Sequence, residues 1–211
     1  MQLTLERRET QECAETFVNV FILKMELERY DRQIRAWGFK TQERLKRCRF
    51  LIYELCSASL ECMKNLILAG ASSIHVVDSS KKIDEFGNYI LFLKNLNPYC
   101  PLRIIDGNID FNDYDFICLF GDDNELLKRM IQSQKACLFC HGLFAYLFFN
   151  IGVDDLVIDE QQNDNTIIDE TITGSLISQL IVDHLPPIDK TILLYMKFNN
   201  ENLSTIVEVL K

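Results

Sequence analysis

The sequence predicts an α/β fold, with a mostly parallel β-sheet, helices on both of its faces and an antiparallel addition at the C-terminal end. Short apolar runs of strand length alternate with helical patterns along the chain, which is the order that a parallel sheet requires. No internal repeat or low-complexity segment interrupts this order. The last two apolar runs follow each other without a helix between them, so we expect them to pair as antiparallel strands.

The first half of the chain predicts a βαβ unit. Residues 41–48 (TQERLKRC) have a helical pattern, because a threonine can cap the start and the end is basic. Residues 49–54 (RFLIYE) have the length of a strand. Residues 57–69 carry apolar side chains at helical spacing, and Gly70 stands where a helix would stop. The next strand is expected at residues 73–78 (SIHVVD).

The second half of the chain continues the alternation. A helix is expected at residues 122–134, where acids in the first turn and bases further on suit the helix dipole. A second, amphipathic helix is expected at 173–185, ended by Pro186-Pro187. Residues 152–170 are acidic and without periodicity, which predicts a loop. Strands are expected at residues 101–109, 114–120, 136–142, 144–152, 191–198 and 204–210.

Composition limits the class of protein. At 211 residues the chain has room for one domain with a sizeable core. Its formal charge of −9 argues against nucleic-acid binding, and no segment reaches the roughly 18 apolar residues of a membrane span. The first 24 residues mix charges and do not have the pattern of a signal peptide. We therefore expect a nuclear or cytoplasmic protein whose cysteines are reduced.

The turn after the first strand, Glu54-Leu55-Cys56-Ser57-Ala58-Ser59, contains no glycine. A phosphate-binding turn needs glycine for close backbone approach and helix N–H groups that face the anion. Glu54 would add a repulsion of about 4 kcal/mol for charges about 4 Å apart at an effective dielectric of about 20. Asp78 could hold ribose hydroxyls or could simply form a turn. The segment is either a degenerate nucleotide site or an ordinary turn that Ser57 or Ser59 caps.

The run Cys137-Leu138-Phe139-Cys140-His141 matches the haem-attachment pattern and contains a redox-type CxxC. It lies within a predicted strand, where cysteines three residues apart point to opposite faces of the sheet. We therefore expect core cysteines. His75 and His184 are scattered, which argues against a zinc site.

The segment RYDRQIRAWG (29–38) is not explained by composition. Three arginines recur at spacing three, and on a helix they would lie on one side, with Tyr30, Ile34 and Trp37 on another. The segment is either a solvated arginine stripe or a docked segment that presents arginine to a carboxylate or phosphate. Since Met25 could itself be a start site, we expect residues 1–24 to be an appendage and residues 25–211 a single compact domain.

A resemblance covers nearly all of the chain from Arg29 onward. RYDRQIRAWG, followed by a Rossmann-type strand, resembles the start of the ThiF/MoeB-like adenylation domains of ubiquitin-like-protein activating enzymes. KNLILAGASSIHVVD (64–78), NLNP (95–98), YDFICL (114–119) and GLFAYLFFNIG (142–152) are similar to later segments of these domains. Within this family the chain is most similar to the non-catalytic subunits of heterodimers, above all of those that activate SUMO.

The chain departs from the active members of the family where they perform chemistry. By alignment, the loop glycines are Glu54, Ser57 and Ser59 here. After Asp78, the family's Asn-Arg-Gln and Lys are not found. No inserted domain with a catalytic cysteine fits between residues 150 and 175. The resemblance therefore implies that this chain binds no cofactor or metal itself, and that a catalytic partner subunit holds ATP, Mg²⁺ and the thiol.

One part of the family's active site is present. The arginine of the family's Tyr-x-Arg motif, here Arg32, reaches across the dimer to the ATP that the other subunit binds. The resemblance thus implies catalysis in trans, with the SUMO-like modifier reached through the complex. Its neighbours would form the interface with the partner: Arg29, Tyr30, Asp31, Gln33, Ile34, Arg35 and Trp37.

Three alternatives stay open at this point. The chain could be the equivalent subunit for a Rub-type modifier, although such subunits usually carry a large insertion. It could be an inactive Rossmann-like binding scaffold without a role in activation. It could also be an enzyme with an altered nucleotide site. The identity of a copurifying protein and ATP binding by the isolated chain would separate these alternatives.

Overall fold

The computed structural model describes residues 28–107, 109–152, 156, 166–199 and 204–209. The chain divides into two compact units, residues 1–42 and residues 43–211. The predicted appendage of residues 1–24 and its boundary lie outside the described residues. In the part of the chain that the structure describes, no helix has the length and apolar character to cross a membrane.

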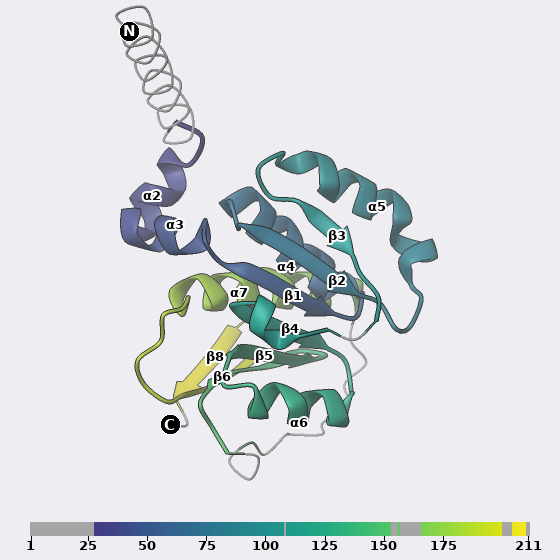
Figure 1. Cartoon of the computed structure of the whole chain (residues 1–211), viewed down its shortest axis with the longest axis vertical. Helices are drawn as coiled ribbons and strands as arrows, with labels where there is room; N and C mark the ends of the chain where they lie inside the picture. The colour runs from purple at the N-terminus through teal and green to yellow at the C-terminus, as the bar shows by residue number, and fades with distance from the viewer. Residues whose placement is uncertain (1–27, 108, 153–155, 157–165, 200–203, 210–211) are drawn as a thin grey trace, which may run out of the picture. The chain divides into compact units, whose positions relative to one another are not determined.

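Residues 43–211 contain one sheet of eight strands in the order β3-β2-β1-β4-β5-β6-β7-β8 (Figure 1). The pairs from β3 to β5 are parallel, and those from β5 to β8 are antiparallel. This confirms the predicted mostly parallel sheet with a C-terminal antiparallel addition, which already begins at β6. The strands are β1 (Arg49–Tyr53), β2 (Ser73–Val77), β3 (Leu102–Ile104), β4 (Phe116–Phe120), β5 (Ala136–His141), β6 (Phe144–Phe149), β7 (Ile192–Asn199) and β8 (Ser204–Val209).

Helices cover both faces of the sheet, as predicted. On one face, Leu127 and Met130 of α6 join a buried cluster with Leu51 of β1 and Phe139 of β5. On the other face lies α4, which packs against α7 (Figure 1). The helices are α2 (Asp31–Trp37), α3 (Phe39–Leu45), α4 (Ser57–Ala69), α5 (Ile83–Leu96), α6 (Asn124–Gln132) and α7 (Ile167–Asp183), with a 3₁₀ turn η1 (Phe111–Asp113).

Helix α5 has no counterpart in the sequence prediction. Ile83, Phe86, Ile90 and Leu93 do recur at helical spacing, but the consecutive apolar run from Tyr89 to Leu93 obscures this pattern. Only Ile90 and Leu93 are buried. Leu91 and Phe92 are exposed, with 61% of Leu91 accessible, and the other apolar side chains of the helix are partly buried. The helical pattern is therefore hard to recognise in the sequence, because apolar residues also occupy the exposed side of the helix.

Helix α7 begins earlier than predicted, so the expected loop ends before residue 167. Thr166 caps the helix: its Oγ1 accepts a hydrogen bond from the Asp169 N–H, and the Asp169 carboxylate accepts one from the Thr166 N–H. Gly174, near the predicted start, lies well inside the helix. It faces α4 so closely that a Cβ there would lie 2.2 Å from the Ala58 carbonyl oxygen.

The bounds of several other elements differ by a few residues from the predicted ones, because a strand or helix ends where its backbone hydrogen bonds end. The strand expected at residues 101–109 is only Leu102–Ile104, and the helix expected at 41–48 is Phe39–Leu45.

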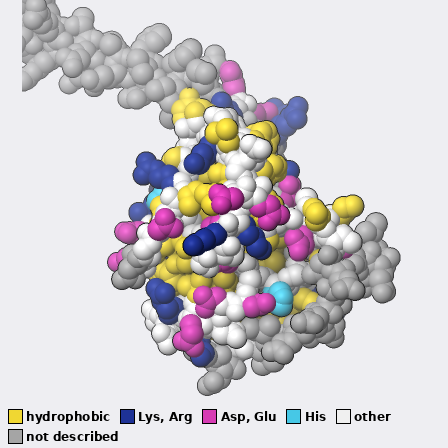
Figure 2. All heavy atoms as spheres, turned by 90° about the vertical axis from the view of Figure 1, so that its right-hand side faces the viewer, with side chains coloured by type: hydrophobic (Ala, Val, Ile, Leu, Met, Phe, Trp, Pro, Cys, Tyr) yellow, Lys and Arg dark blue, Asp and Glu magenta, His cyan; other side chains and the backbone are white. Residues whose placement is uncertain are grey.

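Figure 2 shows the side of the molecule that carries α5 in Figure 1, with hydrophobic side chains exposed among acidic and basic ones. Because β1 pairs in parallel with both β2 and β4, the carboxyl ends of these three strands lie side by side.

Candidate functional site

The turn between β1 and α4 is the segment in which the sequence indicated either a degenerate nucleotide loop or an ordinary turn. The N-cap of α4 is Cys56. Its Sγ accepts a hydrogen bond from the Ser59 N–H at 3.4 Å, and the Ser59 Oγ accepts one from the Cys56 N–H at 2.9 Å. The expected cap by Ser57 or Ser59 is therefore wrong, because Ser59 stands at the third helical position. This reciprocal capping occupies N–H groups that a phosphate would need.

The first turn of α4 also packs against another helix. Its Ala58 backbone lies against Gly174 of α7, as described above. One turn further on, Ser175 of α7 donates a hydrogen bond through its Oγ to Oε1 of Glu61, at 3.1 Å. Ser59 is fully buried, and Ser57 is partly buried. The start of α4 is thus a helix–helix contact.

Glu54 directly follows β1 and points toward the end of β2. Its Oε1 accepts hydrogen bonds from the Ser79 N–H, at 3.2 Å, and from the Ser79 hydroxyl. Its Oε2 accepts one from the Ser80 N–H, also at 3.2 Å. Burial alone would raise the pKa of this carboxyl, but the hydrogen bonds from the two serines outweigh it and lower the pKa. The carboxylate that the sequence placed near the position of a phosphate therefore has hydrogen-bond donors within the chain.

Asp78 forms a turn with its carboxylate. Its Oδ2 accepts a hydrogen bond from the Ile83 N–H at 2.7 Å, at the start of α5. Its Oδ1 accepts one from the Ser80 hydroxyl at 3.1 Å. The side chain that could have held ribose hydroxyls therefore stabilises the β2–α5 connection, which is the second of its two predicted roles.

Sequence reasoning missed Ser79 and Ser80 as partners of Glu54. The three residues are separated by more than twenty positions, and no local pattern links them. A signal for the contact exists only after the parallel pairing of β1 with β2 is known. That pairing places the residues that follow the two strands next to each other.

The segment predicted to act in trans lies in the unit of residues 1–42. Arg32 is exposed, and among the described residues it takes part in no hydrogen bond or ion pair. Arg35 pairs with Asp31 at 3.0 Å within α2. The arginine stripe is not one continuous helix, because α2 begins at Asp31, after a turn at Tyr30, and Arg29 precedes it.

The remaining predicted interface residues differ in exposure. Gln33 and Ile34 are partly exposed, whereas Tyr30 is buried. Trp37 is partly buried and donates a hydrogen bond through its Nε1 to Oε1 of Gln42, at 3.1 Å. A polar partner for the indole N–H anchors this side chain within the unit. The structure gives these residues no partner chain, so their role at an interface stays a prediction.

The cysteines of the CxxC run lie on opposite sides of β5, as expected for an extended strand. The thiol of Cys137 donates to the Met130 carbonyl of α6, whereas Cys140 lies near Cys62 of α4. Burial raises the pKa of Cys137 to about 12. His141 pairs instead with Asp122 at 3.0 Å. Among the described residues, no group of three or more metal-ligating side chains comes together.

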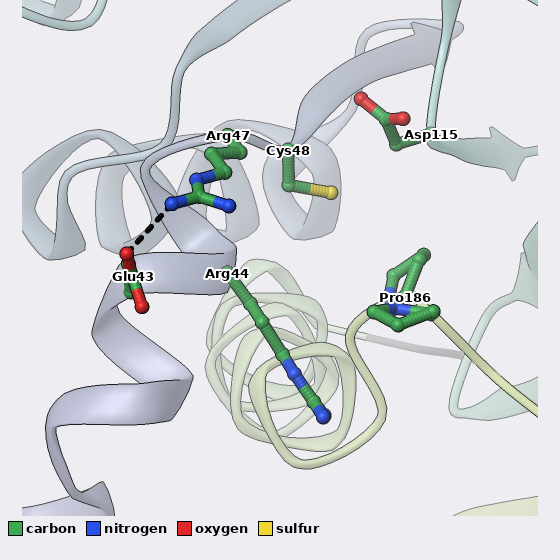
Figure 3. Close-up of a pocket in the computed structure, with 7 residues that line it drawn as sticks. Glu43, Arg44, Arg47, Cys48, Asp115 and Pro186 are labelled. Atoms are coloured by element: carbon green, nitrogen blue, oxygen red, sulfur yellow. Dashed lines mark hydrogen bonds and ion pairs between the residues drawn. The ribbon is translucent and has the colours of Figure 1, made fainter.

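A pocket of about 330 Å³ opens at the amino ends of β1 and β4 (Figure 3). It is therefore at the opposite end of these strands from Glu54 and Asp78. Its acidic side chains already have partners, because Glu43 pairs with Arg47 at 2.6 Å and Asp115 with Arg49 at 3.6 Å. The lining residues are Glu43, Arg44, Arg47, Cys48, Asp115, Pro186 and Pro187.

Comparison with known sequences finds no matching family model. The chain is 27% identical over 165 residues to SUMO-activating enzyme subunit 1 of Xenopus tropicalis, covering 64% of this chain and 48% of the relative. It is 26% identical over 171 residues to the subunit 1 of Homo sapiens, with the same coverage of both chains. It is 29% identical over 178 residues to the DNA damage tolerance protein rad31 of Schizosaccharomyces pombe, covering 69% and 56%. The chain spans about half the length of these relatives.

Comparison with solved structures gives the same fold. The crystal structure of PaaA superposes with a TM-score of 0.63 at 15% identity, covering 88% of this chain and 74% of that chain. Escherichia coli MccB, crystallised with MccA, superposes with a TM-score of 0.60 at 12% identity, covering 86% and 71%. At such identities the likeness concerns the fold alone, that is, the arrangement of helices and strands.

Proposed function

Because the chain belongs to the ThiF/MoeB-like family that includes subunit 1 of the SUMO-activating enzymes, we propose that it is the regulatory, non-catalytic subunit of a heterodimeric SUMO-activating enzyme. The observation that carries the proposal concerns the turn after β1. Backbone N–H groups that a nucleotide phosphate would need donate instead to side chains of this chain, among them Cys56, Ser59 and Glu54. In this proposal a catalytic partner subunit holds ATP and Mg²⁺, and this chain works in the nucleus or the cytoplasm.

The chemistry of such an enzyme is adenylation of a modifier's C-terminal carboxylate. Negative charge builds up on the α-phosphate and the pyrophosphate in the transition state, and a positioned guanidinium stabilises it. Arg32 is exposed and takes part in no hydrogen bond or ion pair with a described residue. Arg35 differs, because its charge is already paired with Asp31. We therefore assign the contribution in trans to Arg32.

The test is ATP–pyrophosphate exchange with SUMO, measured on the isolated chain and on the complex with its catalytic subunit. We expect no exchange by the isolated chain. Arg32→Ala in the complex should lower the rate on the order of 10²-fold, as loss of one transition-state donor does. Lys40→Ala is the control, because Lys40 is an exposed cation on α3 outside the predicted interface, and it should keep the rate near that of the wild type.

Two results would overturn the assignment. Exchange by the isolated chain would show an active nucleotide site within it, and full activity of the Arg32→Ala complex would remove Arg32 from the reaction. A Rub-type modifier that supports exchange in place of SUMO would redirect the proposal to the equivalent subunit. Copurification without any partner that has an intact glycine loop and a catalytic cysteine would favour a binding scaffold.

A further inference from the structure

The carboxylate of Glu54 lies where α/β proteins usually bind their ligands. Open sheets of this kind bind ligands outside the carboxyl ends of the strands, at the point where the strand order reverses. Here that point is β1, which has β2 on one side and β4 on the other. Glu54 follows β1, its hydrogen-bond donors follow β2, and its Cγ lies 3.8 Å from the position of a Cβ built on Gly121, after β4.

The donors around this carboxylate form an anion-binding arrangement. The N–H groups of Ser79 and Ser80 are consecutive, and both face the Glu54 oxygens, as backbone N–H groups in an anion-binding nest do. The Ser79 hydroxyl adds a third donor. Charge-assisted hydrogen bonds of this kind are about twice as strong as neutral ones. The turn after β2 thus already has an anion, which the chain itself supplies.

The backbone at Glu54 supports a specific role for its side chain. Its φ is 70°, in the left-handed region that favours glycine. Glycine would adopt this conformation without strain, and a glycine at the equivalent position is what a phosphate-binding turn needs. A side chain that is kept in a strained conformation and is bonded through both of its oxygens points to a functional constraint at this position.

We propose that Glu54 is a built-in ligand: its carboxylate fills the anion-binding turn of Ser79 and Ser80, excludes phosphate-bearing ligands from this turn, and joins the ends of β1 and β2. The donors of the turn are thus occupied without any nucleotide. This goes beyond the proposed function, since it concerns this chain alone and does not depend on which modifier is activated. It also separates two causes of lost nucleotide binding, namely missing glycines and an internal competitor.

The test uses the full chain and two variants. Glu54→Gly removes the carboxylate and relieves the backbone strain, whereas Glu54→Gln keeps the shape and one acceptor but removes the charge. Glu125→Gln is the control, because Glu125 is an exposed carboxylate that pairs with Lys128 within α6. Hydrogen exchange at the Ser79 and Ser80 amides reports on the turn, and titration with inorganic phosphate, followed by NMR, reports on the anion site.

In the wild type and in Glu125→Gln we expect slow exchange at both amides and no saturable binding of phosphate. In Glu54→Gly, exchange at these amides should rise about tenfold or more, as loss of a charge-assisted hydrogen bond predicts. Phosphate should then bind saturably and slow the exchange again. In Glu54→Gln, which provides the answer if the glycine variant does not fold, exchange should rise to an intermediate level and phosphate should bind more weakly.

The proposal is overturned if exchange at residues 79 and 80 is the same in folded Glu54→Gln as in the wild type. It is equally overturned if neither folded variant binds phosphate, or if the wild type binds phosphate as well as the variants do. None of these results bears on the ATP–pyrophosphate exchange assay with SUMO. Failure of this inference and failure of the proposed function are therefore distinguishable.

Discussion

Hydrogen bonds from Ser79 and Ser80 favour the ionised form of the Glu54 carboxyl in the folded protein. Those hydrogen bonds outweigh the effect of burial and set the folded pKa below the usual value of 4.5. A carboxyl whose pKa is depressed on folding stabilises the protein above its unfolded pKa, and this contribution is lost as the pH falls through the folded pKa. Glu54 therefore makes the stability of the protein depend on pH only under acidic conditions.

We expect the free energy of unfolding of the wild type to fall more steeply between about pH 5 and pH 3 than that of Glu54→Gln. The glutamine variant does not titrate at this site, so the difference between the two proteins should shrink as the pH decreases. Urea denaturation at several pH values measures it, with Glu125→Gln as the control. A constant difference across this range would show that ionisation of Glu54 contributes nothing to stability.

At the scale of elements, the close contact between α4 and α7 depends on Gly174. A methyl group there would lie 2.2 Å from the Ala58 carbonyl oxygen, and backbone cannot move aside as a flexible side chain can. We expect Gly174→Ala to destabilise the protein by about 1–3 kcal/mol, the usual range for an overpacked contact. Thermal denaturation and urea denaturation both measure this change.

The matched control is Gly87→Ala in α5, where a Cβ would have no atom within 4 Å. Alanine at an open position inside a helix should stabilise it by about 0.5–1 kcal/mol. The two substitutions are chemically identical, so opposite signs would attribute the effect at residue 174 to the contact with Ala58. A neutral or stabilising Gly174→Ala would mean that α4 and α7 can separate without loss.

The same two helices show how far the sequence could predict the elements. Strands such as β1 and β4 are buried on both faces, so each is a short run of apolar residues that the sequence alone predicted. The beginning of α7 was missed because residues 152–170 are acidic and show no periodicity, and the contact of Gly174 with Ala58, more than a hundred residues away, leaves no signal in the sequence. Helix α5 was missed because the exposed Leu91 and Phe92 obscure the helical spacing of its buried residues.

The candidate site was predictable only in part, for a related reason. The absence of glycine between Glu54 and Ser59 is visible in the sequence, and so is the carboxylate. The partners of that carboxylate are not, because strand pairing brings residues 54, 79 and 80 together. The cap of α4 likewise depends on a thiol, a weak acceptor that residue preferences do not rank among capping groups.

At the scale of the whole molecule, the proposed roles of the two subunits predict which species ATP stabilises. A ligand stabilises the species that binds it, by about 2.7 kcal/mol at a free concentration of 100 times its Kd. If the partner subunit holds ATP and Mg²⁺, adding both should raise the Tm of the heterodimer. The Tm of the isolated chain should stay unchanged, because the donors at the starts of α4 and α5 are bonded to Cys56, Glu54 and Asp78.

Differential scanning fluorimetry of the isolated chain and of the complex, each with and without ATP and Mg²⁺, measures this prediction. The Arg32→Ala complex adds a further distinction. Because Arg32 is assigned to the transition state, ATP should still raise the Tm of this complex although the rate of ATP–pyrophosphate exchange falls. An increase in the Tm of the isolated chain would instead mean that a nucleotide displaces Glu54 from Ser79 and Ser80, and would return the chain to the class of nucleotide-binding enzymes.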